Sequence, residues 1–556
     1  MMTMKMPGAQ IIVETLISQG VTTVFGYPGG QVLNIYDELY KASDRIRHII
    51  TAHEQGAAHA ADGYARSTGK VGVVIATSGP GASNLVTGIA TAYLDSTPMV
   101  AITGNVPLPL IGRDSFQEVD IAGITMPVTK HNYIVKDVAV LEDTIREAFQ
   151  IAKSGRPGPV LIDVPKDVQI ALCDYVQGGE VAADPFQSPA DEELIQAAKM
   201  VAASKRPFIY SGGGIVSADA SKELLSFAGR IDAPIGTSMM GLSAVPSGYP
   251  GFLGMTGMHG RYAASKAMAE ADLIIAVGTR FSDRATGNKD EFAKKAQVLH
   301  IDIDPAEIGK NIPAQKSLIG NIKDILARLC ALLSPQTHGA WKAQVETMRA
   351  YEKENQEVFL GLSPQYVIQA ANRILGDDLL VATDVGQHQM WAAQYYPFSR
   401  PRSFITSGGL GTMGFGMGAA IGSCIANGEK RTVLFTGDGS FHMNLNEMST
   451  AVANRLPLVI VVMNNGVLGM VRQWQTLFYG QRYSNTTLDR QTDFVKLAEA
   501  FGAKGIRVTN EEEVDAAYRE AMETQGPVLI DCVIHPDEKV LPMIPPGGTI
   551  DDIMLK

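Results

Sequence analysis

Short, unbroken apolar runs recur along the chain and alternate with longer amphipathic stretches. Strands that are buried on both faces of a parallel sheet are continuously apolar, whereas half-exposed strands alternate apolar and polar residues. Such strands, separated by helical segments, predict an α/β fold with parallel sheets. The clearest runs are VGVVIAT (71–77), MVAITG (99–104), PVLIDV (159–164), LIIAVG (273–278), TVLFTG (432–437) and LVIVVMNN (458–465).

The length and two breaks in this rhythm predict the domain organisation. At about 150 residues per domain, a chain of 556 residues is expected to form three or four domains. The segment 174–190 lacks the alternation of apolar and amphipathic stretches, and it ends at Ser188 and Pro189, a helix-start signal. The charged segment 334–362 predicts an exposed helix between domains. We therefore expect three doubly wound parallel-sheet domains, 1–175, 190–335 and 363–540, and a Pro/Gly-rich tail, 541–556.

The first and third blocks share sequence features in the same order. GPVLID occurs at 158–163 and again at 526–531, and each copy closes its block. TSGPGASNL (77–85) parallels TGDGSFHMNL (436–445), and each follows an apolar run. These matches predict two domains of similar topology around a different middle domain. The alternative is shared βα-turn chemistry without a common origin.

Charge and cysteine content exclude several classes of protein. Lys+Arg 47 minus Asp+Glu 58 gives −11, which argues against a nucleic-acid or anionic-membrane binder but not against a locally basic pocket. No apolar run approaches the ~18 residues of a membrane span, and the amino-terminal segment does not resemble a secretory signal. The four cysteines lie far apart without a CxxC pair, which fits a reducing compartment. We therefore expect a cytoplasmic protein with no nucleic-acid and no membrane partner.

An acidic glycine turn and an asparagine pair each follow an apolar run. GDGS (437–440) follows TVLFT, and Asn464 and Asn465 follow LVIVVM after the next amphipathic stretch. Ligands gather at the carboxyl ends of parallel strands, and one βα unit brings two such ends side by side. Oxygens from Asp438, Asn465 and a carbonyl near Val467, with two phosphate oxygens, would satisfy Mg²⁺. This spacing resembles the motif of thiamine-diphosphate (ThDP) enzymes.

Two weaker patterns need separate interpretation. The GxGxxG at 409–414, with Asp438 further on, also fits a dinucleotide-binding fingerprint, but Asp438 already belongs to GDGS. Glu54, in HEQG after IRHIITA, is a candidate for the carboxylate that ThDP chemistry requires beside the pyrimidine ring. A lone Glu there is otherwise a helix cap or a solvated residue; the glycine-rich segments 26–30 and 78–81 around it favour the catalytic interpretation.

Taken together, the motifs resemble the acetohydroxyacid (acetolactate) synthase catalytic subunit over essentially the full chain. The resemblance rests on FGYPGG (25–30), HEQGAAHAADGYAR (53–66), SGPGASNL (78–85), SFQEVD (115–120), TKHNY (129–133), SGRPGPVLIDVPKDV (154–168), DVGQHQMW (384–391), SGGLGTMGFG (407–416), GDGSFHMN (437–444), MNNGVLGMVRQWQ (463–475) and PMIPPG (542–547).

The resemblance implies a ThDP pyrimidine-binding first domain, a central FAD-binding domain and a diphosphate- and Mg²⁺-binding third domain. It implies that Glu54 of one subunit acts on the cofactor that a second subunit binds through its metal ligands Asp438, Asn465 and Val467. A homodimer would therefore be the smallest active unit. The implied ThDP-binding residues are Tyr27, Pro28, Gly29, Gly30, Glu54, Gln387, His388, Gly411, Met413, Gly437, Asp438, Gly439, Ser440, Asn465, Val467, Leu468, Gly469 and Met470. The implied FAD-binding residues are Arg156, Gly212, Gly213, Gly214, His259, Gly260, Arg280, Asp302, Asp304 and Asn321.

The implied reaction decarboxylates pyruvate on ThDP and transfers the two-carbon unit to a second 2-ketoacid. The products would be 2-acetolactate or 2-aceto-2-hydroxybutyrate, in branched-chain amino-acid biosynthesis, and FAD would be structural. Gln117, Phe116 and Lys130 match residues beside the reacting centre, Arg280 matches the residue that binds the acceptor carboxylate, and Trp474, with Met470, contributes to the substrate site. Trp474 implies a preference for 2-ketobutyrate as the acceptor.

The resemblance also implies further partners and leaves rivals. Homodimers or homotetramers and a separate regulatory small subunit are expected. The sequence departs from many members at Ser282, where Asp is common, and at Gly418, where Pro is common, and the first change weakens the FAD inference. Rival functions are a pyruvate oxidase, a glyoxylate carboligase, against which Glu54 argues, and a catalytically silent ThDP-binding partner.

Overall fold

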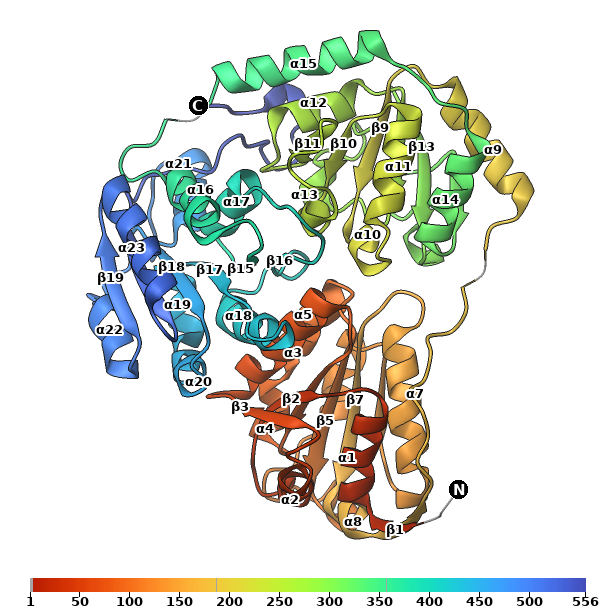
Figure 1. The fold of residues 1–556 in the computed structure, drawn as a ribbon, viewed down its shortest axis with the longest axis vertical. Helices are drawn as coiled ribbons and strands as arrows, with labels where there is room; N and C mark the ends of the chain where they lie inside the picture. Colours follow the sequence, from red (N-terminus) through yellow and green to blue (C-terminus); the bar gives the residue numbers. More distant parts are fainter. Residues whose placement is uncertain (1–3, 187, 357) are drawn as a thin grey trace.

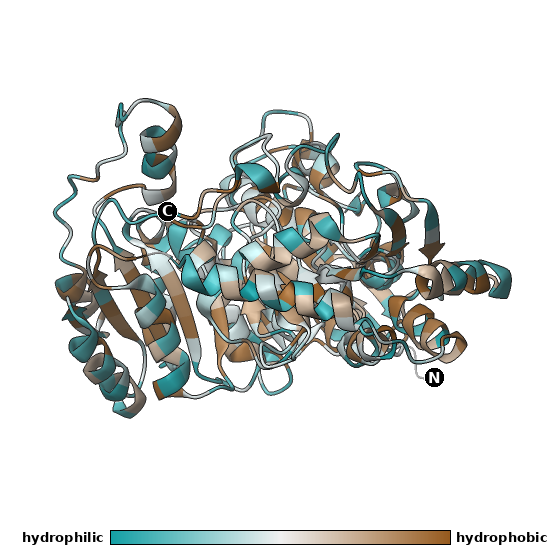
Figure 2. Ribbon diagram, turned by 90° about the horizontal axis from the view of Figure 1, so that it is seen from above, coloured by the Kyte–Doolittle hydropathy of each residue, from teal (hydrophilic) through white to brown (hydrophobic). Residues whose placement is uncertain are grey.

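Three parallel six-stranded sheets, each covered by helices, build the chain (Figure 1). This computed structural model describes residues 4–186, 188–356 and 358–556. The predicted apolar runs are the buried strands, and in Figure 2 the strands are mostly hydrophobic while the covering helices carry polar residues on their outward faces. The predicted α/β parallel-sheet fold is confirmed. None of the described helices is both long enough and apolar enough to cross a membrane.

The first sheet has the order β3-β2-β4-β5-β7-β6. Its strands are β2 (Thr23–Tyr27), β3 (Arg47–Ile50), β4 (Gly72–Ala76), β5 (Met99–Asn105), β6 (His131–Ile134) and β7 (Pro159–Pro165). The helices on its faces are α1 (Gly8–Ser18), α2 (Leu33–Lys41), α3 (Glu54–Thr68), α4 (Pro80–Asn84), α5 (Val86–Leu94), α6 (Ile121–Thr125), α7 (Leu141–Lys153) and α8 (Lys166–Ile170). A short antiparallel pair, β1 (Met4–Pro7) with β8 (Leu172–Tyr175), ties the two ends of this block together.

The third sheet has the order β16-β15-β17-β18-β20-β19. If the strands of each sheet are numbered from one along the chain, the first and third sheets have the same order. The predicted topological similarity is therefore confirmed. Its strands are β15 (Leu380–Thr383), β16 (Phe404–Ile405), β17 (Thr432–Gly437), β18 (Leu458–Asn464), β19 (Lys504–Val508) and β20 (Val528–Val533). Its helices are α16 (Pro364–Leu375), α17 (Gln387–Tyr395), α18 (Phe415–Ala426), α19 (Asp438–Asn444), α20 (Met448–Ala453), α21 (Gly469–Phe478), α22 (Phe494–Phe501) and α23 (Glu511–Glu523).

The middle sheet differs, with the order β11-β10-β9-β12-β13-β14. Its strands are β9 (Pro207–Ser211), β10 (Ile235–Thr237), β11 (Phe252–Met255), β12 (Leu273–Val277), β13 (Gln297–Asp302) and β14 (Lys316–Ile319). Its helices are α9 (Asp191–Ala203), α10 (Gly213–Ser217), α11 (Ser221–Ile231), α12 (Tyr262–Glu270), α13 (Asp283–Thr286) and α14 (Ile322–Leu332). Counted along the chain this is the 3-2-1-4-5-6 order of dinucleotide-binding folds.

The two connecting segments correct the sequence expectations in detail. Helix α9 is capped at Ala190, whose backbone N–H bonds to Glu193, so the predicted start at Pro189 is too early. The charged segment forms α15 (Gly339–Glu354) as predicted, but it is not exposed all round, since Trp341 is buried against the middle block and donates to the Pro207 carbonyl.

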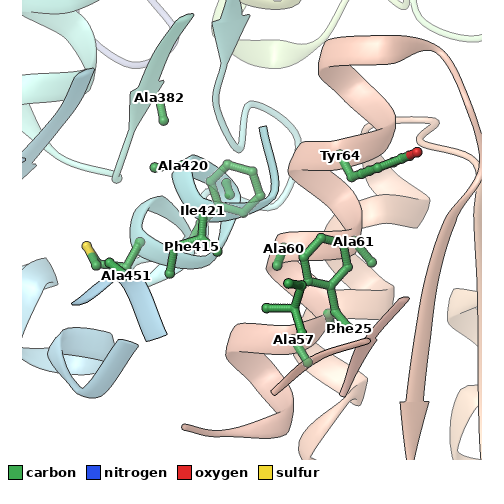
Figure 3. Packing of buried hydrophobic residues seen from close by; sticks show 14 of the residues in the cluster. Phe25, Ala57, Ala60, Ala61, Tyr64, Ala382, Phe415, Ala420, Ile421 and Ala451 are labelled. Carbon is green, nitrogen blue, oxygen red and sulfur yellow. The ribbon is translucent and has the colours of Figure 1, made fainter. Parts of the chain in front are cut away.

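Helices α3 and α18 pack closely and join the first block to the third (Figure 3). Their contact is built from small residues, including Ala57, Ala60 and Ala61 on α3. A Cβ atom on Gly422 of α18 would overlap the carbonyl oxygen of Ala60, so the two backbones approach too closely for any side chain there. Glu54 is the first residue of α3, and this contact therefore fixes where it lies.

Gly422→Ala should force α3 and α18 apart and lower the free energy of unfolding by about 1–3 kcal/mol, the usual cost of overpacking a core. The matched control is Gly229→Ala in α11, where the nearest atom to an added Cβ is the Tyr249 hydroxyl at 4.0 Å. Replacing that glycine should leave stability unchanged or raise it by up to about 1 kcal/mol. Thermal and urea unfolding of both variants measure the difference, and equal effects would contradict the packing argument.

Candidate active site

The acidic turn and the asparagine pair lie at adjacent strand ends. Strands β17 and β18 pair in parallel, with Gly437 opposite Met463, so Asp438 at the start of α19 and Asn465 after β18 share one edge of the sheet. Asp438 is buried. Burial raises the pKa of Asp438 to about 6, although the carboxylate accepts hydrogen bonds from nearby backbone amides, including those of Gly439 and Gly466.

Helix α17 adds two polar side chains to this edge. The Asn465 Nδ2 atom donates to Gln387 Oε1 at 3.2 Å, and Asn465 Oδ1 accepts from the Val467 backbone N–H at 3.2 Å. The Nε2 atom of His388 is buried and has no hydrogen-bond partner within the described part of the chain. Desolvation lowers the pKa of His388 to about 3, so the ring is neutral. An added Cβ on Gly437 would come within 2.9 Å of the His388 ring.

This donor set fits a cation that shares its ligands with phosphate. Within residues 4–186, 188–356 and 358–556, no three His, Cys, Asp or Glu side chains are grouped so that they could hold a metal ion. Asp438 could offer one carboxylate and Asn465 one amide oxygen to such a cation, so its further ligands would have to come from backbone and from the bound molecule. Mg²⁺ is typically held in this way, by one or two carboxylates plus phosphate oxygens.

The glycine-rich segment that carries Gly411 and Met413 is fixed from both sides. The backbone N–H of Gly414, a residue with φ +89°, donates to Asp384 Oδ1 at 2.7 Å. Asp95 of the first block accepts from the backbone N–H groups of Gly408 and Gly409, at 3.1 and 2.7 Å. The sequence analysis assigned no role to Asp384, although it begins the DVGQHQMW segment, and none of the quoted segments contains Asp95.

Glu54 is the partly buried first residue of α3. Its Oε2 atom accepts a hydrogen bond from Asn84 Nδ2 at 3.0 Å, and an added Cβ on Gly81 would lie 3.3 Å from Oε1. The SGPG turn therefore packs directly on this carboxylate, in agreement with the grouping expected from the sequence. The YPGG segment lies at the same end of the sheet, where Gly30 has open space beside it and its carbonyl accepts from Lys166 Nζ at 3.3 Å.

The predicted residues of the reacting centre are only partly brought together. Phe116 is 85% exposed, and Gln117, with φ +59°, packs on the SGPG turn at Gly79. Lys130 is turned elsewhere: its Nζ atom donates to the carbonyls of Ser154 and Ile151, just after and within α7. Desolvation lowers the pKa of Lys130 to about 8.

A cavity of about 1710 Å³ lies where the three blocks meet. Most of the predicted FAD residues line it, together with part of the predicted substrate site: Arg156, Gly213, Gly214, His259, Arg280, Asp302, Asn321, Gly411, Met470 and Trp474. Gly212 and Gly260 support its wall, where added Cβ atoms would overlap Gly278 and Thr256, and Asp304 pairs with Arg156 at 3.6 Å. The volume exceeds the ~300–1,000 Å³ of ordinary ligand pockets.

The end of α5 contacts this cavity and all three blocks. The Leu94 carbonyl accepts from Arg280 Nη1 at 2.6 Å, Asp95 holds Gly408 and Gly409, and the Ser96 hydroxyl accepts from Arg156 Nε at 2.7 Å. We call residues 94–96 the α5 junction. His259 Nδ1 in the cavity is buried and lacks a hydrogen-bond partner within the described part of the chain, which fits a polar ligand.

A second arginine of the RFSDR segment, Arg284, contacts the predicted substrate residue Trp474. The Arg284 guanidinium lies over the Trp474 ring, 5.8 Å from its centroid, and Phe478 contacts the same ring edge-to-face at 5.6 Å. Both Arg284 and Trp474 line the cavity. Sequence reasoning missed Arg284, although the paired arginines of RFSDR were a signal that could have indicated it.

Comparisons with known proteins agree with this arrangement. Residues 6–124, 194–329 and 384–532 match the N-terminal TPP-binding, central and C-terminal TPP-binding domains of thiamine pyrophosphate enzymes. The chain is 45% identical to the probable acetolactate synthase large subunit of Methanocaldococcus jannaschii, over 99% of this chain and 95% of the relative.

Two bacterial relatives are equally similar. The acetolactate synthase large subunit of Corynebacterium glutamicum is 46% identical over 99% of this chain and 90% of the relative. The acetolactate synthase isozyme 2 large subunit of Escherichia coli is 46% identical over 99% of this chain and all of the relative. The chain therefore belongs to the acetolactate synthase large-subunit family of thiamine pyrophosphate enzymes.

Proposed function

We propose that the chain is the catalytic subunit of an acetolactate synthase. It decarboxylates pyruvate and joins the two-carbon unit to a second 2-ketoacid, giving 2-acetolactate or 2-aceto-2-hydroxybutyrate. The observation that carries the proposal is the side-by-side placement of Asp438 and Asn465 at the ends of β17 and β18, in a chain that matches these synthases over nearly its whole length. The product class places the enzyme in branched-chain amino-acid biosynthesis.

The third block holds the diphosphate end of ThDP through Mg²⁺. Asp438 and Asn465 supply side-chain ligands and Val467 a carbonyl ligand. Gln387 and His388, whose Nε2 atom has no hydrogen-bond partner among the described residues, lie at the same edge. When bound, ThDP supplies the electron sink for loss of carbon dioxide from a 2-ketoacid.

Glu54 would hold a proton toward the pyrimidine ring of bound ThDP. Asn84 orients that carboxylate by donating to Oε2. The cofactor served by Glu54 belongs to the third block of a second copy, so the active unit is a homodimer or a homotetramer of dimers. The 85% exposure of Phe116 in a single chain supports this, because a substrate-contacting aromatic ring needs a second wall.

The acceptor 2-ketoacid binds beside Trp474. Arg284, which lies over that ring and lines the cavity, is placed to bind the acceptor carboxylate through its planar fork, whereas Arg280 donates to the Leu94 carbonyl. Phe116 and Gln117 complete the wall from the partner, and Lys130 acts through the segment it anchors at the end of α7.

The large cavity holds FAD in a structural role, since the reaction has no net redox change. Arg156, His259, Asp302 and Asn321, which line the cavity, would bind it. A separate regulatory small subunit binds the chain, as the name of the large-subunit relatives suggests. A cytoplasmic location fits all of these assignments.

The proposed function predicts a single main product. Purified protein with pyruvate, Mg²⁺ and ThDP should form 2-acetolactate, and Glu54→Gln should lower kcat by about 10²–10⁴-fold, the usual contribution of a positioned acid–base group. Binding of ThDP should survive this change, because Asp438 and Asn465 hold the diphosphate. Product analysis by mass spectrometry and ThDP titration measure both effects. Acetyl phosphate or tartronate semialdehyde as the main product would identify a pyruvate oxidase or a carboligase instead.

Acceptor choice should depend on Trp474. With pyruvate and 2-ketobutyrate in competition, the wild type should favour 2-ketobutyrate about tenfold or more, because one added methylene in an apolar site contributes about 1–3 kcal/mol. Trp474→Leu should abolish most of that preference. Arg284→Gln should raise the acceptor KM for both 2-ketoacids without changing their ratio. An unchanged product ratio in Trp474→Leu would remove this assignment.

The FAD assignment predicts a coloured protein. The purified chain should be yellow and release flavin on denaturation. Arg156→Ala should weaken flavin retention, because it removes a guanidinium that lines the cavity and is held in place by Glu307, at 2.8 Å, and by Ser96. Visible absorbance and the flavin-to-protein ratio are the measurements. A colourless preparation with full activity would refute this assignment.

A further inference from the structure

We propose that Glu447, a residue of the third block outside every motif discussed above, is a positioning residue for Glu54. This inference rests on the proposed function, because it assigns Glu447 a role in aiming the carboxylate that acts on the cofactor. Glu447 closes the short 3-10 turn Leu445–Glu447, which directly continues α19 from Asp438.

The carboxylate of Glu447 binds the backbone just before Glu54. Its Oε2 atom accepts from the Ala52 N–H at 3.1 Å, and its Oε1 atom accepts from the His53 N–H at 3.0 Å. The Thr450 hydroxyl donates to Oε2 at 2.7 Å and holds the carboxylate in place. Glu447 is fully buried, so these bonds are shielded from water and are of the stronger, charge-assisted kind.

A glycine in the first turn of α3 makes this approach possible. An added Cβ on Gly56 would overlap the Oε1, Cδ and Cγ atoms of Glu447. The turn that begins with Glu54 therefore rests directly on the Glu447 side chain, with no room for a larger residue between them.

The two contacts define where the Glu54 carboxylate points. Glu447 fixes the backbone on one side, and Asn84 fixes the carboxylate on the other by donating to Glu54 Oε2 at 3.0 Å. If the bonds from Glu447 are lost, the N–H groups of Ala52 and His53 lose their acceptor and the first turn can shift. A displacement of about 1 Å at a reacting group can cost about 10²-fold in rate.

The decisive variant is Glu447→Gln, which preserves size but turns an NH₂ group toward one of the two N–H donors. Glu429→Gln is the matched control. Glu429 also joins the third block to the first, through an ion pair with Arg47 at 3.1 Å. Both of these side chains are about half exposed, and the pair involves neither α3 nor Glu54. Three quantities are measured on the purified holoenzyme: the thermal midpoint, the Kd of ThDP, and the rate of C2 proton exchange of bound ThDP in D₂O.

The expected result for Glu447→Gln is proton exchange slowed by about tenfold or more, the scale expected for a misplaced reacting group, with the Kd of ThDP essentially unchanged. Glu429→Gln should exchange like the wild type. A purely structural role for Glu447 would lower the thermal midpoint and leave the exchange rate of the folded holoenzyme unchanged, and that result overturns the proposal.

Two further variants keep the outcome interpretable. If Glu447→Gln does not fold, Thr450→Val decides, since it frees the Glu447 carboxylate without removing it; slower exchange supports the proposal and wild-type exchange overturns it. Glu54→Gln is measured in parallel. Wild-type exchange in Glu54→Gln contradicts the proposed function itself, whereas slow exchange there with wild-type exchange in Glu447→Gln contradicts only the positioning role.

Discussion

The close contact between α3 and α18 is the constraint on which the two outer blocks depend. At Gly422 the helices approach until an added Cβ would overlap the Ala60 carbonyl, and at Gly418 an added Cβ would lie 2.6 Å from the Gly56 carbonyl. Helix α3 begins at Glu54, and α18 begins directly after the segment that carries Gly411 and Met413. A contact between two backbones leaves little freedom to slide, because interiors are densely packed and resist small displacements. The helix pair therefore transmits its geometry to both of the loops that carry chemistry.

The two outer blocks use the same βα turn for different tasks. The turn after β4 has the sequence SGPG and packs on Glu54, while the turn after β17 has GDGS and presents the buried carboxylate of Asp438. Both sheets have the same strand order, so these turns occupy equivalent places. A proline after the first glycine gives a rigid support, whereas an aspartate in the same place presents a buried carboxylate. One strand order thus serves both outer blocks, and the middle block, with another strand order, lines the large cavity together with them.

Much of the fold and part of the candidate site could be predicted from the sequence, because the patterns that indicate them are local. Buried parallel strands are continuously apolar, so the runs at 99–104 and 458–465 identified β5 and β18 directly. The neighbouring positions of Asp438 and Asn465 followed from chain order alone. Arg284 was missed although RFSDR contains it, because its contact with Trp474 joins two blocks. Glu447 was missed because no local pattern records its bonds to the backbone of another block. The start of α9 was misjudged for a related reason: Ser188 and Pro189 form a good helix-start signal, but Glu193 bonds to the backbone N–H of Ala190 instead.

The α5 junction has a consequence for recombination between related genes. Its three consecutive residues bond to Arg280 and Arg156 and to the backbone of Gly408 and Gly409, so one turn of chain is matched to partners encoded far apart. A crossover that replaces the middle block alone must bring an arginine that reaches the old Leu94 carbonyl, while a replaced carboxyl-terminal half must offer two backbone amides to the old Asp95 carboxylate. Chimeric enzymes will tolerate exchange of a block only when the three blocks, whatever their parent, all fit the geometry of the α5 junction.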